Sequence, residues 1–190
     1  MSSTKVIIGR PKNLVRFSYA HVHEPKAITE GEDEKYSVSL IISKDDKKTL
    51  AKVNAAIKAA VELGKSSKWG GKVPKNLKKP LRDGDEDRED EEAYENAYFI
   101  NANSRTKPGL VDKDLDEIIT KEDFYSGCYG RASVNFYPYD TGTSKGIACG
   151  LNHLQKIKDG DPLGGVIGTA ADHFGEDNDF EDEDFDEDEI

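Results

Sequence analysis

The chain has 190 residues, a length typical of a single domain and sufficient to bury a sizeable core. Charged residues make up 34% of it, hydrophobic residues 35%, and the formal net charge is −11. No apolar run approaches the roughly 18 residues that a membrane-spanning helix requires, and the first residues lack the pattern of a secretory signal. The two cysteines, Cys128 and Cys149, are too few for a disulfide framework. We therefore expect a soluble intracellular protein.

The net charge is unevenly distributed along the chain. Residues 1–82 carry 18 Lys and Arg against eight Asp and Glu, whereas residues 83–95 carry nine acidic side chains and a single basic one, Arg88. Residues 176–190 add 11 acidic side chains and no basic one. A basic segment combined with an acidic tail indicates a polyanionic partner whose access the tail controls. The alternative is that the acidic runs are merely solvated, disordered segments.

Alternating side chains predict two strands in the first quarter of the chain. Residues 13–23 and 35–43 both alternate between apolar or aromatic and polar side chains, which is typical of half-buried strands. The segment between them contains proline and glycine and is typical of a loop. Residues 6–8 begin the first strand early, with a bulge or break at Gly9.

A single amphipathic helix is predicted over residues 46–63, ended by Gly64. Its apolar side chains recur at spacings of three and four residues, and alanines keep its helix propensity high. Residues 65–82 contain prolines, a Gly-Gly pair and little apolar content, so a loop is expected there. The acidic residues 83–95 extend this loop, and a loop of such length is usually functional or disordered.

The second half of the chain supplies the remaining strands. Residues 98–102 form a short strand, residues 106–127 are irregular, and residues 128–139 form a long strand in a hairpin with residues 146–155. Glycine and aspartate dominate beyond Lys158, and order is expected to fade by about Phe174. With at least five strands and one main helix, the chain is predicted to be mainly β and to form a small closed or partly open barrel.

The loop at residues 65–82 is the sharpest local signal for a ligand. It contains seven basic residues, no acidic one, and the only tryptophan of the chain, Trp69. Lysines neutralise phosphates, and an exposed aromatic ring offers any base a stacking surface. Because a Gly-Gly pair follows Trp69, its ring is expected to reach outward. The alternative is a flexible, solubilising loop whose tryptophan is buried in the core.

The strand predicted at residues 128–139 has an unusual polar face. Small or apolar side chains at every second position suit a core, while the alternate positions include Tyr129, Arg131 and Tyr137. Aromatic rings beside a cation on one side of a strand form a platform on which single-stranded bases can stack. The alternative is a second small core covered by the helix or by a loop.

Residues typical of catalysis or of a metal site are scarce. No glycine-rich phosphate loop precedes a helix, and no cluster of Cys or His completes a zinc site around His21 and His23. Asp83, Asp85 and Asp87 resemble the start of a calcium loop, but the required glycine and final glutamate are missing. We therefore predict that the protein is not an enzyme and uses neither a metal nor another cofactor.

The acidic tail at residues 176–190 also contains apolar side chains. Phe180, Phe185 and the terminal Ile190 interrupt its acidic residues, a pattern that suits short-lived docking to a basic partner. The same tract can occupy the protein's own basic surface when nucleic acid is absent. The alternative is a tail that serves solubility alone, which leaves the phenylalanines unexplained.

Three sequence blocks in the second half of the chain resemble those of a known family. They are YSGCYGRASVNFYPY from Tyr125, KGIACGLNHLQKI from Lys145 and DPLGG from Asp161. These blocks, together with the helix and the Trp-Gly pair, are similar to phage single-stranded DNA-binding proteins, a family once catalogued as a domain of unknown function. The resemblance implies an OB-fold, a five-stranded barrel, over residues 1–175, followed by a disordered acidic tail at 176–190.

The resemblance also implies a function. It is that of a non-enzymatic protein that coats and protects single-stranded DNA in phage replication or recombination, in the cytoplasm of the bacterial host. The acidic tail would regulate access of DNA and recruit replication or recombination proteins. The sequence does not reveal whether duplex DNA also binds weakly. Little sequence preference is expected. The residues expected to contact DNA are Arg16, Lys68, Trp69, Lys72, Lys75, Tyr129, Arg131 and Tyr137.

Two other functions fit part of the sequence. An acidic interaction protein could mimic DNA and occupy a basic host protein, although the neutral body and the basic loop at residues 65–82 argue against it. An RNA-binding OB-fold would differ only in its preference for 2′-hydroxyl groups, which the sequence does not reveal.

Overall fold

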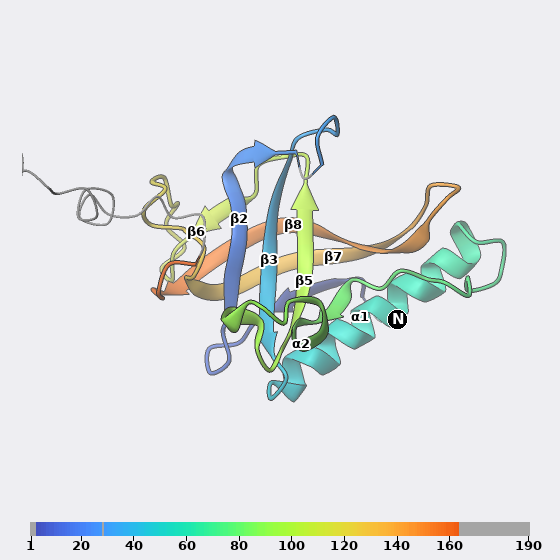
Figure 1. Ribbon diagram of the computed structural model, residues 1–190, viewed down its shortest axis with the longest axis horizontal. Helices are drawn as coiled ribbons and strands as arrows, with labels where there is room; N and C mark the ends of the chain where they lie inside the picture. The colour runs from blue at the N-terminus through green and yellow to red at the C-terminus, as the bar shows by residue number, and fades with distance from the viewer. Residues whose placement is uncertain (1–2, 28, 164–190) are drawn as a thin grey trace, which may run out of the picture.

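Five strands pair in a closed ring in the computed structural model, which describes residues 3–27 and 29–163 (Figure 1). The ring runs from β7 through β2, β3, β5 and β8 back to β7, and only the β5–β8 pairing is parallel. Its strands are β2 (Val15–Lys26), β3 (Lys35–Ser43), β5 (Ala97–Ser104), β7 (Tyr129–Asp140) and β8 (Lys145–Lys158). This ring confirms the predicted mainly β fold of the OB type. The predicted tail lies outside the described residues.

Three short strands extend the sheet beyond the ring. β1 (Lys5–Ile8) pairs with β7, β4 (Leu81–Asp83) pairs with β5, and β6 (Gly109–Val111) pairs with β8. β1 is separated from β2 by Gly9, whose φ of +101° and close approach to the Gly130 carbonyl leave no space for a Cβ atom. The predicted break at Gly9 is therefore confirmed.

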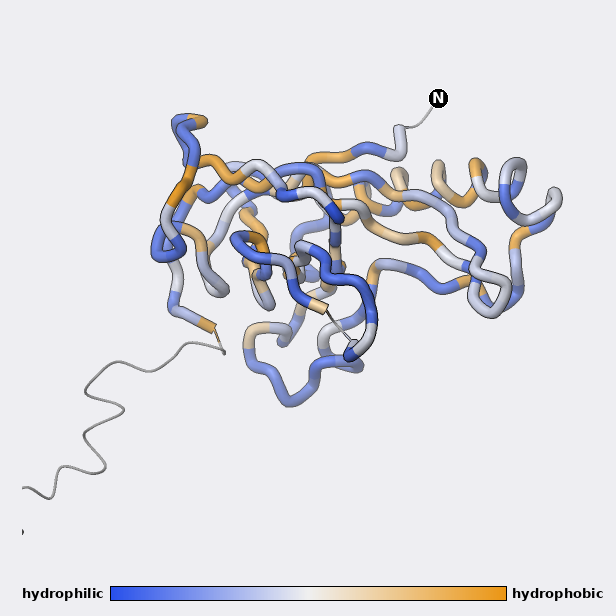
Figure 2. The backbone as a smooth tube through the Cα atoms, turned by 90° about the horizontal axis from the view of Figure 1, so that it is seen from above, coloured by the Kyte–Doolittle hydropathy of each residue, from blue (hydrophilic) through white to orange (hydrophobic). Residues whose placement is uncertain are grey.

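Alternate positions of the strands fill the interior of the barrel. On β7, Ala132, Val134 and Phe136 are buried, while the positions between them are half-buried or exposed, as the alternation in the sequence predicts. Along the strands, apolar segments alternate with polar ones, and most loops at the rim are hydrophilic (Figure 2). Burying each large apolar side chain stabilises the fold by about 1.5–3 kcal/mol. The largest contributors from the other ring strands include Phe17, Leu40, Ile42, Ile100 and Leu154.

The main helix, α1 (Lys47–Ser67), packs against β1, β7 and β8 and lies along the lower side of the barrel in Figure 1. Its cap is Asp46, which accepts the Thr49 N–H at 3.3 Å and Arg10 Nη2 at 2.6 Å. The prediction that Gly64 ends the helix is wrong, because the helix continues to Ser67. None of the helices in the described part of the chain combines the length and apolar character needed to cross a bilayer.

Gly64 is a packing position rather than a helix end. A Cβ atom there would lie 2.6 Å from Cβ of Pro138 and 2.7 Å from the ring of Trp69. Trp69 is only 8% exposed, and its Nε1 donates a hydrogen bond to the Tyr139 carbonyl at 3.3 Å. The prediction that Trp69 reaches outward is therefore wrong: its ring fills the space between the end of α1 and the end of β7.

The acidic segment at residues 83–95 folds onto the barrel instead of extending a loop. It contains α2 (Gly84–Asp87) and a 3-10 turn, η1 (Glu92–Tyr94). Tyr94, 1% exposed, packs edge-on against Phe99 of β5 and donates its hydroxyl hydrogen to Ser39 Oγ of β3 at 2.8 Å. A second apolar cluster thus forms on the outside of the barrel, made of Ile41, Tyr94, Ala97 and Phe99. The prediction that these residues merely extend the loop is wrong, and so is the disordered alternative for them.

The close packing at Gly64 predicts a large effect of a small substitution. Gly64→Val should destabilise the protein by about 1–3 kcal/mol, because its methyl groups would have to displace Trp69 or Pro138. Urea unfolding followed by circular dichroism measures this change. Ser66→Ala, an exposed position two residues further along the same helix, is the matched control and should leave stability within about 0.5 kcal/mol. Equal stability of the two variants would contradict the packing role of Gly64.

Candidate nucleic-acid interface

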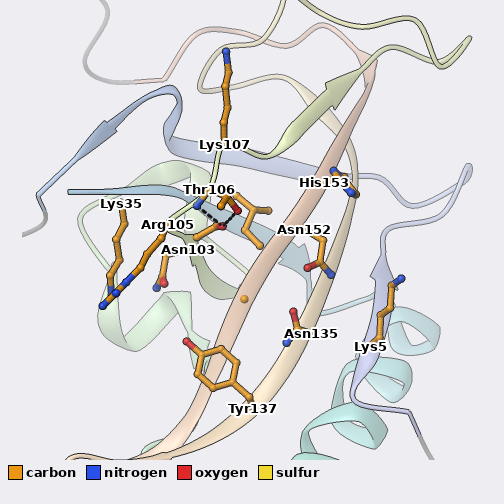
Figure 3. A pocket seen from close by; sticks show the side chains of 13 residues that line it. Lys5, Lys35, Asn103, Arg105, Thr106, Lys107, Asn135, Tyr137, Asn152 and His153 are labelled. Carbon is orange, nitrogen blue, oxygen red and sulfur yellow. Dashed lines mark hydrogen bonds between the residues drawn. The ribbon is translucent and has the colours of Figure 1, made fainter. Parts of the chain in front are cut away.

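A groove of about 780 Å³ crosses the outer face of the barrel where β5 and β8 diverge (Figure 3). The parallel pairing of these strands ends at Asn103 opposite Gly150, after which the chain turns through residues 105–108 into β6. β6 then rejoins β8 beside His153. We call this the basic groove; it is lined by Lys5, Lys35, Asn103, Ser104, Arg105, Thr106, Lys107, Asn135, Tyr137, Gly150, Leu151, Asn152 and His153.

The basic groove concentrates positive charge. Lys5, Lys35, Arg105 and Lys107 line it, and no Asp or Glu of the described residues does. In Figure 3, Lys35 and Arg105 lie together on one side of the groove and Lys5 lies on the other. Two acidic residues lie near these cations. Asp33 is 3.7 Å from Arg105, with both side chains largely exposed, and Glu32 lines an adjoining hollow with Lys35 and Arg105. Exposed cations in this arrangement can neutralise the phosphates of a bound polyanion.

The floor of the groove offers an aromatic ring and amide groups. Tyr137, 40% exposed, projects from β7 into the groove beside Asn135, and Asn152 of β8 adds a second amide (Figure 3). Gly150 contributes no side chain to the floor, and a Cβ atom there would lie only 2.9 Å from Asn135 Oδ1. A ring of this kind can stack on a base of any sequence, and the amides can donate to and accept from base edges.

Hydrogen bonds hold the cationic 105–108 loop over β8. The Ser104 hydroxyl accepts the Thr106 N–H at 3.1 Å, and the Gly109 N–H donates to His153 Nδ1 at 3.1 Å (Figure 3 shows the bonds at Thr106). Sequence analysis missed the groove cations Lys5, Lys35, Arg105 and Lys107, because they come from three separate segments that only the barrel topology brings together. Of the residues that line the groove, Tyr137 was the one included among the predicted DNA contacts.

Arg16 and Tyr129 lie together, but outside the basic groove. They are opposite one another on β2 and β7, and the guanidinium carbon of Arg16 lies 5.2 Å from the centre of the Tyr129 ring. Arg16 Nε donates to the Gly127 carbonyl at 3.1 Å, and Nη2 donates to the Asp161 carbonyl at 2.7 Å. Carboxylates of Glu92 and Glu95 border the same hollow. Arg16 therefore holds together the segments before β7 and after β8, and its predicted contact with DNA stays a prediction.

Hydrogen bonds to Asp159 also hold the segment that follows β8. Asp159 accepts Lys156 Nζ at 2.7 Å and the Tyr125 hydroxyl at 2.9 Å, and these bonds, that of Lys156 first, lower the pKa of the Asp159 carboxyl. Arg131, another predicted DNA contact, is also engaged within the protein: its Nε and Nη2 donate to Gln155 Oε1 at 2.9 and 2.6 Å.

The predicted loop lysines belong to a second basic surface. Lys68, Lys72 and Lys75 are exposed in the segment after α1, as predicted. This segment joins the barrel at Lys78, whose N–H donates to the Lys145 carbonyl at 3.0 Å and whose carbonyl accepts the Ile147 N–H at 2.9 Å. A series of exposed lysines runs from α1 to this point, and none of them forms an ion pair with a described carboxylate. They are Lys47, Lys48, Lys52, Lys58, Lys65, Lys68, Lys72, Lys75, Lys78 and Lys79.

The two basic surfaces adjoin along the β7–β8 hairpin. Ala148, one residue beyond the attachment of Lys78, is the cross-strand partner of Tyr137 at the edge of the basic groove. A polyanion leaving the groove past Tyr137 would therefore meet Lys78 and Lys79 first, and the lysines at 68–75 afterwards.

Comparison with known proteins identifies the family. A family model described as the ssDNA-binding protein of Enterobacter phage Enc34 matches residues 4–186. The chain belongs to the Enc34 single-stranded DNA-binding protein family. Protein p50 of Acyrthosiphon pisum secondary endosymbiont phage 1 is 27% identical over 172 residues, which cover 85% of this chain and 90% of p50.

Solved structures agree with the Enc34 family fold. The bacteriophage Enc34 protein in complex with ssDNA is 25% identical to this chain, with a TM-score of 0.73 over 85% of this chain and 90% of that one. The single-stranded DNA-binding protein gp2.5 of bacteriophage T7 is 11% identical, with a TM-score of 0.57 over 90% and 93% of the two chains. The likeness to gp2.5 shows the fold alone.

One acidic group of this Enc34 family member has the spacing of a metal site. Asp112, Asp114 and Asp116 place carboxylate oxygens within 4.8 Å of one another. Asp112 Oδ1, however, already accepts the backbone N–H groups of Asp114 and Asp116 at 2.8 and 3.0 Å. Because exposed acidic residues in turns commonly gather in this way, we assign no metal to them.

The contacts of Arg16 predict a structural role that can be measured. Arg16→Gln should lower the free energy of unfolding by about 1–2 kcal/mol, because two carbonyls lose a charged donor. It should leave the affinity for oligo-dT unchanged, which anisotropy titration measures. Lys12→Gln, at an exposed position on the connection that precedes β2, should change neither property. Weaker DNA binding at unchanged stability would instead restore Arg16 as a phosphate contact.

Proposed function

We propose that this protein binds single-stranded DNA through the basic groove and coats it during phage replication or recombination in the cytoplasm of the bacterial host. The observation that carries the proposal is the combination of four cations, no described carboxylate and an exposed tyrosine in one groove. Membership of the Enc34 family supports it. The Enc34 protein, whose fold this chain shares, has been solved with ssDNA bound.

Each part of the groove has a distinct task in this proposal. Lys5, Lys35, Arg105 and Lys107 neutralise successive phosphates, which supplies affinity without reading sequence. Tyr137 stacks on a base at about 1–3 kcal/mol, and Asn135 and Asn152 hydrogen-bond to base edges. Binding is expected to weaken as the salt concentration rises, because neutralised phosphates release their counterions.

The second basic surface continues the path of the strand. Lys68, Lys72 and Lys75 carry charge but no exposed aromatic partner, since Trp69 is buried. Contacts of this kind reach the backbone alone, and they would hold a duplex as readily as a single strand. We therefore infer that weak binding of duplex DNA resides on this surface, while the basic groove supplies the preference for single strands.

The acidic tail regulates this binding in our proposal. The 11 acidic residues of 176–190 complement the charge of the basic surfaces, so the tail competes with DNA for them. When DNA displaces the tail, Phe180, Phe185 and Ile190 become available to replication or recombination proteins with a basic docking groove.

Substitutions in the groove test the DNA-binding proposal directly. Tyr137→Ala should weaken oligo-dT binding about 5- to 150-fold, because one stacking surface is lost. Lys107→Gln should weaken it less and should reduce the slope of log affinity against log salt by about 0.7, the contribution of one phosphate contact to a single strand. Anisotropy titrations at several salt concentrations measure both effects.

Two controls make this test decisive. Lys113→Gln removes an exposed lysine from a turn outside the groove and should leave affinity and salt slope unchanged. Thermal unfolding of Tyr137→Ala should match that of the unmodified protein, because the ring is 40% exposed. Unchanged DNA affinity in both groove variants would refute the groove as the binding site. No DNA binding by any form would favour the acidic DNA-mimic function.

Removal of the tail tests the regulatory proposal. A chain ending at Gly175 should bind oligo-dT more tightly, with the largest gain at low salt, because an internal competitor of opposite charge is removed. A full-length chain with Phe180 and Phe185 changed to Ala retains the charge and is the matched control. It should keep the affinity of the unmodified protein while losing capture of tail-dependent partners. Equal DNA affinity with and without the tail would contradict the competition.

A further inference from the structure

A second, smaller pocket opens beside the basic groove on the outer face of β2, β3 and β5. Its volume is about 230 Å³, below the roughly 300–1,000 Å³ typical of sites for drug-sized ligands, so it suits a single planar ring system. Ser37, which lines it, is the cross-strand partner of Asn103 in the basic groove. The residues that line the pocket are Tyr19, His21, Lys26, Ala27, Ser37, Val38, Ser39, Arg88 and Asn101.

Tyr19 is held at the pocket in an unusual conformation. Its φ of +46° lies in the left-handed region, which residues other than glycine rarely adopt, at a bulge where the β2–β3 register shifts between Ser18 and His21. The side chain is 49% exposed, so burial of the ring does not account for this conformation. Its hydroxyl donates to Glu91, and this bond, followed by burial, raises the Tyr19 pKa. Strained backbone that presents an exposed ring is typical of ligand-binding sites.

Arg88 supplies a second flat surface next to Tyr19. It is the only cation of the acidic segment 83–95. Its guanidinium carbon lies 5.5 Å from the ring centres of Tyr19 and of Phe99 and 5.9 Å from that of Tyr94, and 33% of the side chain is exposed. Its Nε has no hydrogen-bond acceptor among the described residues, although Glu91 Oε2 lies 3.5 Å away as an ion-pair partner. Guanidinium planes and tyrosine rings are the two surfaces on which proteins stack the bases of single strands.

Polar groups surround the space in front of these surfaces. Asn101 of β5 and Ser37 of β3 each offer donors and acceptors. Burial, and after it the charge of Lys26, lowers the pKa of His21, so the imidazole is neutral at pH 7 and offers one donor and one acceptor. No Asp or Glu of the described chain lines the pocket. The polar groups of Asn101, Ser37 and His21 match the edges of a base, and the pocket also contains two cations, Lys26 and Arg88.

We propose that this pocket holds one unstacked base of the bound single strand, which stacks on Tyr19 and the Arg88 guanidinium and is read at its edge by Asn101 and Ser37. The proposal rests on the DNA-binding function proposed above and adds one position of base preference to a site that is otherwise tolerant of sequence. Asn101 and Asn103 are two residues apart on β5, about 7 Å, so the pocket and the basic groove can engage neighbouring parts of one strand.

The first experiment compares homopolymers on the full-length protein. Oligo-dA, oligo-dC and oligo-dT of equal length are titrated by anisotropy against the unmodified protein, Asn101→Ala and Tyr19→Ala. The unmodified protein should prefer one homopolymer by at least about fivefold. Both variants should reduce that ratio to within about twofold. Asn54→Ala, an exposed asparagine on α1, is the matched control and should keep the preference.

Each outcome distinguishes this inference from the DNA-binding proposal. Equal affinity of the unmodified protein for all homopolymers would overturn the base pocket and leave DNA binding intact. Weaker binding by the variants with the preference retained would also overturn it, since the pocket would then contact only the backbone. No binding of any homopolymer would overturn both proposals.

A second measurement does not depend on variant stability. Oligonucleotides with a single 5-iodouracil are photo-crosslinked to the unmodified protein, and the modified residue is mapped by mass spectrometry. Crosslinks at one position of the strand should fall on Tyr19, and crosslinks at a neighbouring position should fall on Tyr137. Crosslinks to Tyr137 without any to Tyr19 would place the bases in the basic groove alone and overturn the pocket.

Discussion

The antiparallel pairing of β7 with β8 is the interaction on which the rest of the structure depends. It closes the barrel, since β7 also pairs with β2 and β8 also pairs with β5. Because side chains alternate along a strand, the same pairing that buries Val134 and Phe136 forces Asn135 and Tyr137 outward. The core and the floor of the basic groove are therefore two faces of one hairpin, and the floor is as rigid as the core. The hairpin also carries the attachment point of the basic segment at Lys78.

The acidic segment 83–95 lies beside the surface that we propose binds DNA, and its local contacts show how its carboxylates are accommodated there. Its carboxylates are engaged locally: Asp83 and Asp85 hold Lys44, Asp87 holds Arg82, and Glu91 holds Tyr19. Tyr94 anchors the segment to the barrel with a buried ring. The segment therefore covers an apolar patch of β3 and β5 and directs its single arginine across that face. Its remaining exposed carboxylates would repel phosphates from this part of the surface.

The sequence predicted the parts of this structure that depend on local pattern. Period-two alternation located β3 and β7 and placed Tyr137 on the outer face, and helical spacing located α1. It misplaced Trp69, because lysines and glycines flank that residue while the ring packs against Gly64 and the distant Pro138. It missed Lys5, Lys35 and Arg105, because each stands alone in the sequence and only strand order brings them to one groove. Clusters of charge in the sequence were therefore a poor guide to clusters of charge in space.

The basic groove and the smaller pocket divide their chemistry between strands and a connecting loop. Tyr137 of the groove and Asn101 of the pocket stand on ring strands, opposite Ala148 of β8 and Ser39 of β3. Arg105 and Lys107 stand on a connecting loop and carry long side chains. Base stacking and hydrogen bonds to base edges require a well-defined geometry, whereas a phosphate can be neutralised from several positions. The aromatic and amide groups therefore lie on strands, and these cations lie on a loop. In the proposed complex, the strands would set the spacing of the bases and the loop cations would adjust to the position of the backbone. A protein built in this way can remain tolerant of sequence over most of its site and still discriminate at one pocket.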